Sequence, residues 1–304
     1  MSAHGVKVGN ISVDQMTNIL MKRKFNWMRN AQLAVVLLCA ALVKLYYSTA
    51  SVNQLRWILA PTTFLVEMIS GTRFEFESHA GYMNDDRSFI IAASCAGINF
   101  LITSFLMLSL SKLWKDRSPD ATHKPRWRFI PVAGMFAYLA TLVANTVRIS
   151  TALHLNRMPP EISWLNPNQL HRFEGIFIYF GFLLLLFMVS EKLTSEAPWT
   201  SQSASFRKRT CPPRGATSGL SKRTLGDDCQ RTLGESGFLR QSLFPLLVYY
   251  GTTLGIPIAN GAYRQGSSFW EHSLYVLLTP LILIVPLVTF RFFRYQLAQR
   301  RRQV

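Results

Sequence analysis

The sequence has few of the residues that build metal centres and disulfide frameworks. Only four cysteines and six histidines occur among 304 residues. No CxxC pair, no His/Cys spacing suited to zinc and no carboxylate/His cluster with ligand spacing is present. We therefore expect no metal ion, no organic cofactor and no disulfide framework. Cys39 lies in an apolar run, where a buried structural thiol is expected, and Cys211 and Cys229 are expected to be ordinary free thiols.

Acidic residues are scarce as well, and their scarcity leaves a large positive charge. The chain has 16 Asp and Glu against 33 Lys and Arg, a formal net charge of +17. A nucleic-acid-binding domain would combine such an excess with modest hydropathy. Here the mean hydropathy is +0.16, and the basic residues lie almost wholly between apolar runs. This pattern argues against a nucleic-acid partner and favours a polytopic membrane protein with basic loops.

Apolar runs of the length that a helix needs to cross ~30 Å of hydrocarbon are frequent. Six are clear, at about 31–47, 88–110, 129–153, 172–190, 243–260 and 272–292. A seventh run at 55–71, LRWILAPTTFLVEMISG, is short and carries Arg56, Pro61 and Glu67. We predict an all-α, polytopic integral membrane protein with about six transmembrane helices, and we interpret 55–71 as a re-entrant or interfacial segment.

Composition divides the chain into five parts. They are a basic N-terminal tail (1–30), a membrane domain with the candidate site (31–192), a flexible basic loop (193–242), a C-terminal transmembrane hairpin (243–292) and a basic tail (293–304). The 193–242 loop is rich in Ser, Thr, Gly, Arg and Lys, which is typical of a linker. A signal peptide is the alternative interpretation of the first apolar run, but its long polar lead and Lys44 favour a membrane helix.

The charges of the loops predict their sides, because short cytoplasmic loops accumulate Lys and Arg. Both tails and the 111–128 and 191–242 loops are basic, so we expect them inside. The 71–88 loop is acidic, and 155–171 and 261–271 carry few basic residues, so we expect these outside.

Three polar residues that are far apart in sequence reach the outer ends of the predicted spans. Cys95 lies about seven residues, or ~10 Å, into a descending span, Arg148 ends a rising span and His171 opens the next descending one. An arginine in a membrane helix indicates a functional site unless it snorkels to the headgroups. Taken singly, Cys95 would be a structural thiol and His171 an interfacial histidine.

Taken together, these three residues suit acyl transfer. A thiol ordinarily has a pKa near about 8.5, so a nearby cation such as Arg148 favours the nucleophilic thiolate of Cys95. His171 can act as a general acid or base, and Arg148 could hold the oxyanion of a tetrahedral intermediate. We therefore predict a site like that of a cysteine protease. His272, and after it His154, are the alternatives to His171 as the base.

Four further residues are candidates for orienting a substrate or the site itself. Gly97 leaves room for a substrate backbone beside the sulfur, and Asn99, one turn after Cys95, can donate an amide hydrogen bond on the same face. Asn145 and Glu174 each stand three residues from one of the other two site residues and can orient it. The alternatives are close helix packing for Gly97, and interhelical hydrogen bonding or interface solvation for Asn145 and Glu174.

Several motifs in this order resemble the exosortase/archaeosortase family of integral-membrane cysteine transpeptidases. They are SCAGINF at 94–100, NTVR at 145–148 and HRFEG at 171–175, within a likeness that covers residues 55–292. The segments LRWILAP, RFEFE, LGIPIANGA and FWEHSLYVL are most similar to the exosortase K branch.

The resemblance implies a thiol protease and transpeptidase in the bacterial cytoplasmic (inner) membrane, with its active site facing the periplasm or outside and with membrane lipids around it. Its partners would be exported proteins with a PEP-CTERM-like C-terminal signal, which is a short motif, a transmembrane helix and a basic tail. Cys95 would be the nucleophile that forms a thioacyl intermediate, Arg148 the arginine of the NxxR motif and His171 the third member.

Two other classes of function stay open at this point. A noncatalytic membrane component of exopolysaccharide or surface-protein assembly would need none of the site chemistry. A small transporter would use Arg148 and His171 to line an ion path, and it predicts an internal repeat with paired broken helices, which the sequence does not show.

Overall fold

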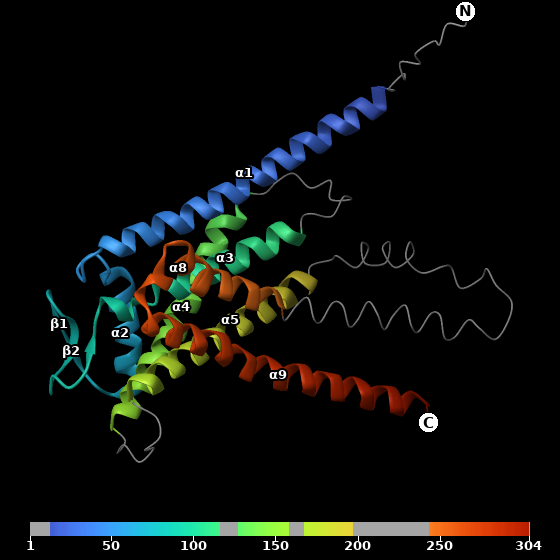
Figure 1. Ribbon diagram of the computed structural model, residues 1–304. Helices are drawn as coiled ribbons and strands as arrows, with labels where there is room; N and C mark the ends of the chain where they lie inside the picture. The colour runs from blue at the N-terminus through green and yellow to red at the C-terminus, as the bar shows by residue number, and fades with distance from the viewer. Residues whose placement is uncertain (1–12, 116–126, 158–166, 197–242, 304) are drawn as a thin grey trace, which may run out of the picture.

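The computed structural model describes residues 13–115, 127–157, 167–196 and 243–303, which are mostly helical (Figure 1). The longer helices are α1 (Val13–Thr49), α2 (Arg56–Ser70), α3 (Ile98–Lys115), α4 (Phe129–Arg157), α5 (Pro167–Glu196) and α9 (Ser267–Gln303). Residues 243–250 are helical and continue through a π-helical turn, η2 (Gly251–Gly255), into α8 (Ile256–Ala259). A 3-10 turn, η3 (Ala262–Gln265), precedes α9.

Five helical stretches are long and apolar enough to cross a membrane. They are Trp27–Thr49, Ala93–Lys115, Phe129–Asn156, Arg172–Leu193 and Phe269–Pro286. The apolar helix Leu243–Ala259, predicted as a sixth span at 243–260, is shorter. The described residues are therefore compatible with a multi-pass membrane protein, with five of the six predicted spans at full length.

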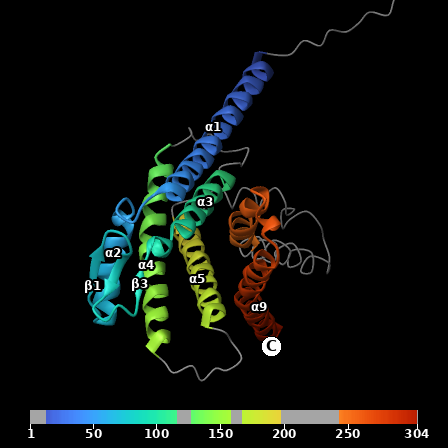
Figure 2. The same ribbon diagram turned by 60° about the vertical axis from the view of Figure 1, so that its left-hand side comes forward.

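Helix α3 lies at the centre of the packing, in contact with α1, α4 and α5 (Figure 2). Helix α4 also packs against α2 and α5, and α5 packs against α9. A helix that is apolar all round is typically buried, and α3 contributes to both apolar clusters of the core. Ile98 and Leu106 pack in the cluster with α1, α2 and α4, whereas Phe100 and Met107 pack in the cluster with α5 and α9.

Successive long helices of the bundle run antiparallel, so the C-terminal end of one lies near the N-terminal end of the next. Helix α1 ends, α3 begins, α4 ends and α5 begins at one end of the bundle, on the left of Figure 1, where α2 and a small sheet also lie. We call this the sheet end. At the opposite end, Lys115 of α3 forms an ion pair of 2.6 Å with Glu191 of α5, whose carboxylate also accepts a 3.5 Å hydrogen bond from Ser111.

The two predicted tails are not separate from the helices. Residues 13–30 are part of α1 and residues 293–303 are part of α9, and both helices extend past the rest of the bundle (Figure 1). The helical pattern continues into these basic segments because Lys, Arg and Gln are good helix formers. Residues 197–242 of the predicted 193–242 loop, which include Cys211 and Cys229, lie outside the described residues.

The prediction of an all-α fold misses a small antiparallel sheet. Its strands β1 (Phe74–Glu77), β2 (Gly81–Asn84) and β3 (Ile90–Ile91) are paired in the order β1-β2-β3. The FEFE run alternates apolar and acidic residues, the period of a half-buried strand, and Phe74 is buried while Glu75 is exposed. The strands are only two to four residues long. Because the alternation is so short, the acidic residues of this segment led to the prediction of a loop.

Helix α2 occupies the predicted re-entrant or interfacial segment. It is 15 residues long, ends at Gly71 and is not among the helices that are long and apolar enough to cross a membrane. One face packs against α4. The opposite face exposes Phe64, Met68 and Ile69 by 62%, 68% and 63%. Helix α2 is therefore apolar on its outer face as well as on its packed face, and its Glu67 carboxylate accepts a 2.7 Å hydrogen bond from the backbone N–H of Phe74 in β1.

The predicted span 88–110 begins too early. Ile90 and Ile91 form β3, residues Ala93–Ala96 form a 3-10 turn, η1, and α3 starts only at Ile98. Gly97 separates the two with a left-handed backbone, φ +68°, which interrupts the helix. Cys95 therefore lies in a turn at the sheet end, and not ~10 Å down a continuous helix as the sequence predicted.

Candidate functional site

Cys95 is held on a short, well-bonded turn. Its backbone N–H donates to the Ala92 carbonyl at 2.9 Å, and its side chain is half-buried. The N–H groups of Phe100 and Leu101 both donate to the Gly97 carbonyl at 3.0 Å, which starts α3 directly after the turn. A left-handed backbone is costly for a residue with a Cβ. Glycine at position 97 therefore allows the turn that places Cys95 just before the start of α3.

Gly97 also allows two other helices to approach the turn. A Cβ at this position would lie 3.2 Å from Thr141 Cγ2, 3.3 Å from Asn145 Cγ and 3.4 Å from the Tyr179 hydroxyl. The space beside Gly97 is therefore filled by α4 and α5. The prediction that Gly97 leaves room for a substrate backbone is wrong, and the alternative of close helix packing holds.

Asn145 of α4 connects the cysteine turn to α5. Its side-chain amide is fully buried, donates a short hydrogen bond from Nδ2 to the Cys95 carbonyl and accepts one at Oδ1 from the Tyr179 hydroxyl at 2.9 Å. Because one partner is an acceptor and the other donates, the orientation of the amide follows from them. Asn145 thus holds the Cys95 backbone, and it reaches Arg148 through Tyr179.

Arg148 contacts the same tyrosine, which is partly buried. Its Nη1 donates to the Tyr179 hydroxyl at 3.2 Å, and its guanidinium carbon lies 5.4 Å from the centre of the Tyr179 ring. The Tyr179 ring in turn stacks on Phe100 of α3, with centroids 5.0 Å apart and planes at 16°. The Arg148 side chain crosses α5 at Gly175, where a Cβ would lie only 3.0 Å from Arg148 Nε.

The charge of Arg148 acts on the cysteine and on one carboxylate. The guanidinium interacts electrostatically with Cys95 and with Glu174, which is buried in α5. The structure therefore brings together Cys95, Arg148, Asn145 and Glu174 of the sequence-predicted set.

A second polar contact lies on the side of the turn that faces α1. Lys44 Nζ donates to Asn99 Oδ1 at 2.8 Å and lies 5.6 Å from the centre of the Tyr47 ring. Tyr47 interacts electrostatically with Cys95 and with Arg148. Because Gly97 interrupts the helix, the prediction that Asn99 lies one helical turn from Cys95 is wrong, and the contacts with α1 determine where Asn99 lies.

Of the three candidate histidines, the structure describes the side chains of His154 and His272. His171 lies in the first turns of α5, at the sheet end, but its side chain is outside the described residues, so its role stays a prediction. His272 and His154 are both exposed, and neither makes a hydrogen bond within the described ranges. His272 interacts electrostatically with Arg172 at the start of α5.

Sequence reasoning missed three residues of this network, although each had a signal. Tyr179 stands four residues after Gly175 and eight after His171, a spacing that places all three positions on one helical face. Lys44 is the charged residue of an otherwise apolar run, and such residues usually have a function or a partner. Tyr47 lies one turn after Lys44, on the same side of α1.

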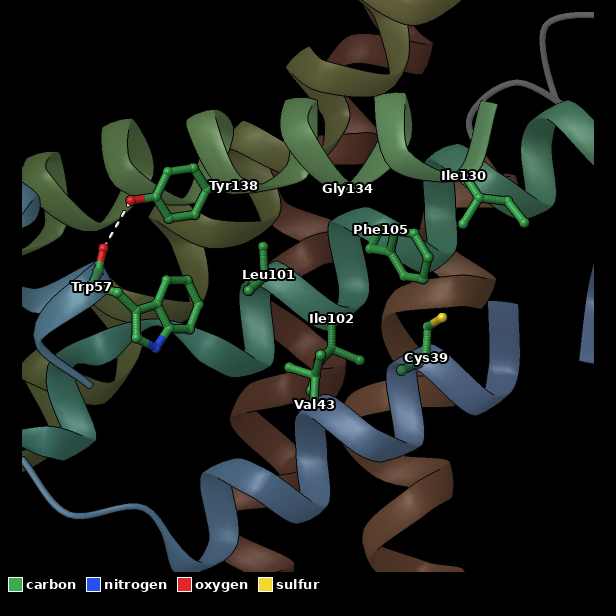
Figure 3. Close-up of a pocket in the computed structure, with 10 residues that line it drawn as sticks. Cys39, Val43, Trp57, Leu101, Ile102, Phe105, Ile130, Gly134 and Tyr138 are labelled. Carbon is green, nitrogen blue, oxygen red and sulfur yellow. Dashed lines mark hydrogen bonds between the residues drawn. The ribbon is translucent and has the colours of Figure 1, made fainter. Parts of the chain in front are cut away.

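Cys39 lies in a different environment, an apolar cavity of about 310 Å³ between α1, α3 and α4 (Figure 3). Val43, Phe105 and Ile130 are among its lining residues, and the Tyr138 hydroxyl on its wall donates to the Trp57 carbonyl at 2.9 Å. The lining residues include no Lys, Arg, His, Asp or Glu. This environment fits the predicted structural thiol, in contrast to that of Cys95.

Comparisons of the chain with protein-family models, with curated proteins and with solved structures find no match. Among the residues that the structure describes, no group of three or more His, Cys, Asp or Glu side chains could hold a metal ion. The side chains that the structure brings together at the sheet end include a half-buried thiol and a partly buried guanidinium, with an amide that holds the Cys95 backbone and a hydroxyl that binds the guanidinium.

Proposed function

We propose that this chain is an exosortase-like membrane cysteine transpeptidase that cleaves a C-terminal sorting signal of exported proteins. One observation carries the proposal: a hydrogen-bonded path runs from the Cys95 carbonyl through Asn145 and Tyr179 to Arg148. It holds a candidate nucleophile and a permanent cation in one arrangement at the end of an apolar bundle. A purely structural thiol such as Cys39 has no such surroundings.

In the proposed orientation, the sheet end faces the periplasm or the outside, and both termini lie in the cytoplasm. The basic residues of both tails and of the 111–128 and 191–242 loops support this orientation. The apolar outer face of α2 would lie against lipid at the depth of the outer leaflet, as expected of a re-entrant or interfacial helix.

The proposed reaction begins when the Cys95 thiolate attacks the carbonyl carbon of the scissile peptide bond. A C–S bond forms, and the carbonyl π electrons move onto oxygen to give a tetrahedral oxyanion. When the carbonyl re-forms, the C–N bond breaks and the amine leaves with a proton. An acceptor nucleophile then attacks the thioester, takes the acyl group and returns the thiolate.

The residues around Cys95 would share the work of this reaction. Arg148 supports the thiolate by its charge, and Tyr179 and Gly175 place its guanidinium. The thiol proton would pass to His171 and then to the leaving amine, the usual exchange of a general base and acid. Buried Glu174 balances the charge of Arg148 within the apolar bundle.

The test is mass spectrometry of the C-terminal peptides of exported proteins in the native host. Wild type is compared with Cys95→Ala and, as the matched control, with Cys39→Ala, at equal protein levels in the membrane. We expect one or more proteins to keep an uncleaved C-terminal membrane segment in the Cys95→Ala strain alone. Identical C-termini in all three strains would refute the proposal and favour a noncatalytic membrane component or a transporter.

A further inference from the structure

Lys44 is placed where a membrane helix rarely carries a charge. It lies in the apolar stretch Trp27–Thr49 of α1, and a charged residue there is costly unless it has a partner or a function. Its ammonium group reaches across to α3 and donates a 2.8 Å hydrogen bond to Asn99 Oδ1. Neither Lys44 nor this bond has a part in the reaction described above.

The contact determines which way the Asn99 amide points. A lysine ammonium has three donors and no acceptor, so it can bind only the oxygen of a carboxamide. The Nδ2 group must then point away from Lys44. Within the described part of the chain, Nδ2 makes no hydrogen bond, and the Asn99 side chain is exposed. Two N–H donors are therefore presented at the surface of α3 in a defined orientation.

Asn99 in α3 and Cys95 in the turn before it both lie toward α1. Lys44 and Tyr47 are three residues apart and share one face of α1. Lys44 binds Asn99, while Tyr47 and Cys95 pack against the same apolar cluster and interact electrostatically. Since one face of α1 meets both residues, Asn99 and Cys95 both face α1 near the sheet end.

We propose that Asn99 donates a hydrogen bond to the oxyanion that forms when Cys95 attacks a substrate carbonyl, and that Lys44 is the positioning residue that orients the Asn99 amide for it. The inference rests on the proposed function and adds to it a hydrogen-bond donor beside α1. An amide held ready before the reaction stabilises the developing negative charge without a cost of reorganisation.

Five variants distinguish a role of Asn99 as an oxyanion donor from a hydrogen bond that only links α1 to α3, which we call the tie. Asn99→Asp keeps an acceptor for Lys44, and hence the tie, but it has no N–H donor. Asn99→Ala removes both. Lys44→Met leaves the amide free to turn, Lys44→Arg restores a donor to Asn99 Oδ1, and Lys44→Met combined with Asn99→Ala tests whether the two residues act together.

Two rates are measured on the full chain in lipid nanodiscs. The first is the rate of cleavage of the substrate that the Cys95→Ala comparison identifies. The second is the rate at which iodoacetamide alkylates Cys95, with the other three cysteines replaced by serine. The second rate needs no substrate and reports the state of the thiol, which an oxyanion donor does not change.

We expect Asn99→Asp and Asn99→Ala to cleave roughly 10²–10³ times more slowly, the usual effect of losing one oxyanion donor. Lys44→Met should be about tenfold slower, Lys44→Arg close to wild type, and the double variant no slower than Asn99→Ala, because Lys44 acts through Asn99. The alkylation rate should stay within about twofold of wild type in Asn99→Ala and Lys44→Arg, which do not change the charge near the thiol, since thiol reactivity depends on the thiolate and its access.

Cleavage by Asn99→Asp at the wild-type rate would overturn the inference, because the tie between helices would then suffice. Alkylation that slows in parallel with cleavage in Asn99→Ala would also overturn it, since Asn99 would then be acting on the thiol. If Cys95→Ala still processes exported proteins, the proposed function itself fails. If Cys95→Ala is inactive while the Asn99 variants are fully active, only this inference fails.

Discussion

The Tyr179 hydroxyl offers the sharpest test of the network around Cys95. It donates to Asn145 Oδ1 at 2.9 Å and accepts from Arg148 Nη1 at 3.2 Å. Tyr179→Phe removes both bonds but keeps the ring that stacks on Phe100. The substitution therefore leaves buried apolar area almost unchanged and isolates the contribution of the hydroxyl.

The magnitude follows from the two bonds. Interhelical hydrogen bonds in membranes contribute about 0.6 kcal/mol on average and up to about 1.7 kcal/mol, and bonds to charged groups in proteins contribute about 1.5–3 kcal/mol. The Arg148 bond is at the long end of the normal range. We expect Tyr179→Phe to lower the free energy of unfolding by about 1–3 kcal/mol and, because Arg148 loses its hydroxyl support, to slow cleavage by at least about tenfold.

Tyr249→Phe is the matched control. Tyr249 is buried and packs its ring on Phe180, but its hydroxyl makes no hydrogen bond within the described ranges. Unfolding by titration with SDS in mixed micelles gives the free energy for both variants, and cleavage in nanodiscs gives the rate. Equal stability and equal cleavage in Tyr179→Phe and Tyr249→Phe would refute the argument that the hydroxyl holds Arg148 and Asn145.

Three further substitutions test other parts of the structure. Gly97→Ala should destabilise the chain by at least about 1–2 kcal/mol, because residue 97 has a left-handed backbone and close neighbours. Its control is Gly134→Ala, where a Cβ meets no atom within 4 Å. This control should be neutral or stabilising by up to about 1 kcal/mol in the same SDS titration. Gly175→Ala should push the Arg148 side chain aside and slow cleavage at unchanged protein levels, and a wild-type rate in nanodiscs would contradict this placement. Lys115→Met should lower the free energy of unfolding by no more than about 1 kcal/mol, because its ion pair with Glu191 is partly exposed, and it should not alter cleavage. Adding Glu191→Gln should recover most of that loss, because the unpaired carboxylate is then removed. A further loss of stability in the double variant would show that the ion pair itself is unimportant.

Local sequence patterns were sufficient to predict most of the helices. Apolar runs near 20 residues marked α1, α4 and α5 well, because a helix satisfies its own backbone hydrogen bonds and needs only an apolar surface. The same reasoning failed at residues 88–97. Strand β3 depends on pairing with β2, and the break before α3 depends on the left-handed Gly97, and neither appears in a hydropathy count.

The candidate site was also predicted only in part. The SCAGINF and NTVR motifs marked Cys95 and Arg148 from the sequence, since a thiol and an arginine in apolar runs are chemically conspicuous. The roles of Gly97 and Asn99 were predicted less well. Both predictions assumed one continuous helix through Cys95, whereas the chain turns there and presents Gly97 to α4 and α5 and Asn99 to Lys44.

By itself, the sequence determined the mostly helical, apolar character of this protein and the positions of the thiol and the arginine in its apolar runs, because these follow from composition and from order along the chain. Only the tertiary structure decided that Tyr179 joins Asn145 to Arg148 and that Lys44 meets Asn99. Hydrogen-bond partners on different helices are chosen by how closely and at what rotation those helices pack, and that depends on the whole core at once.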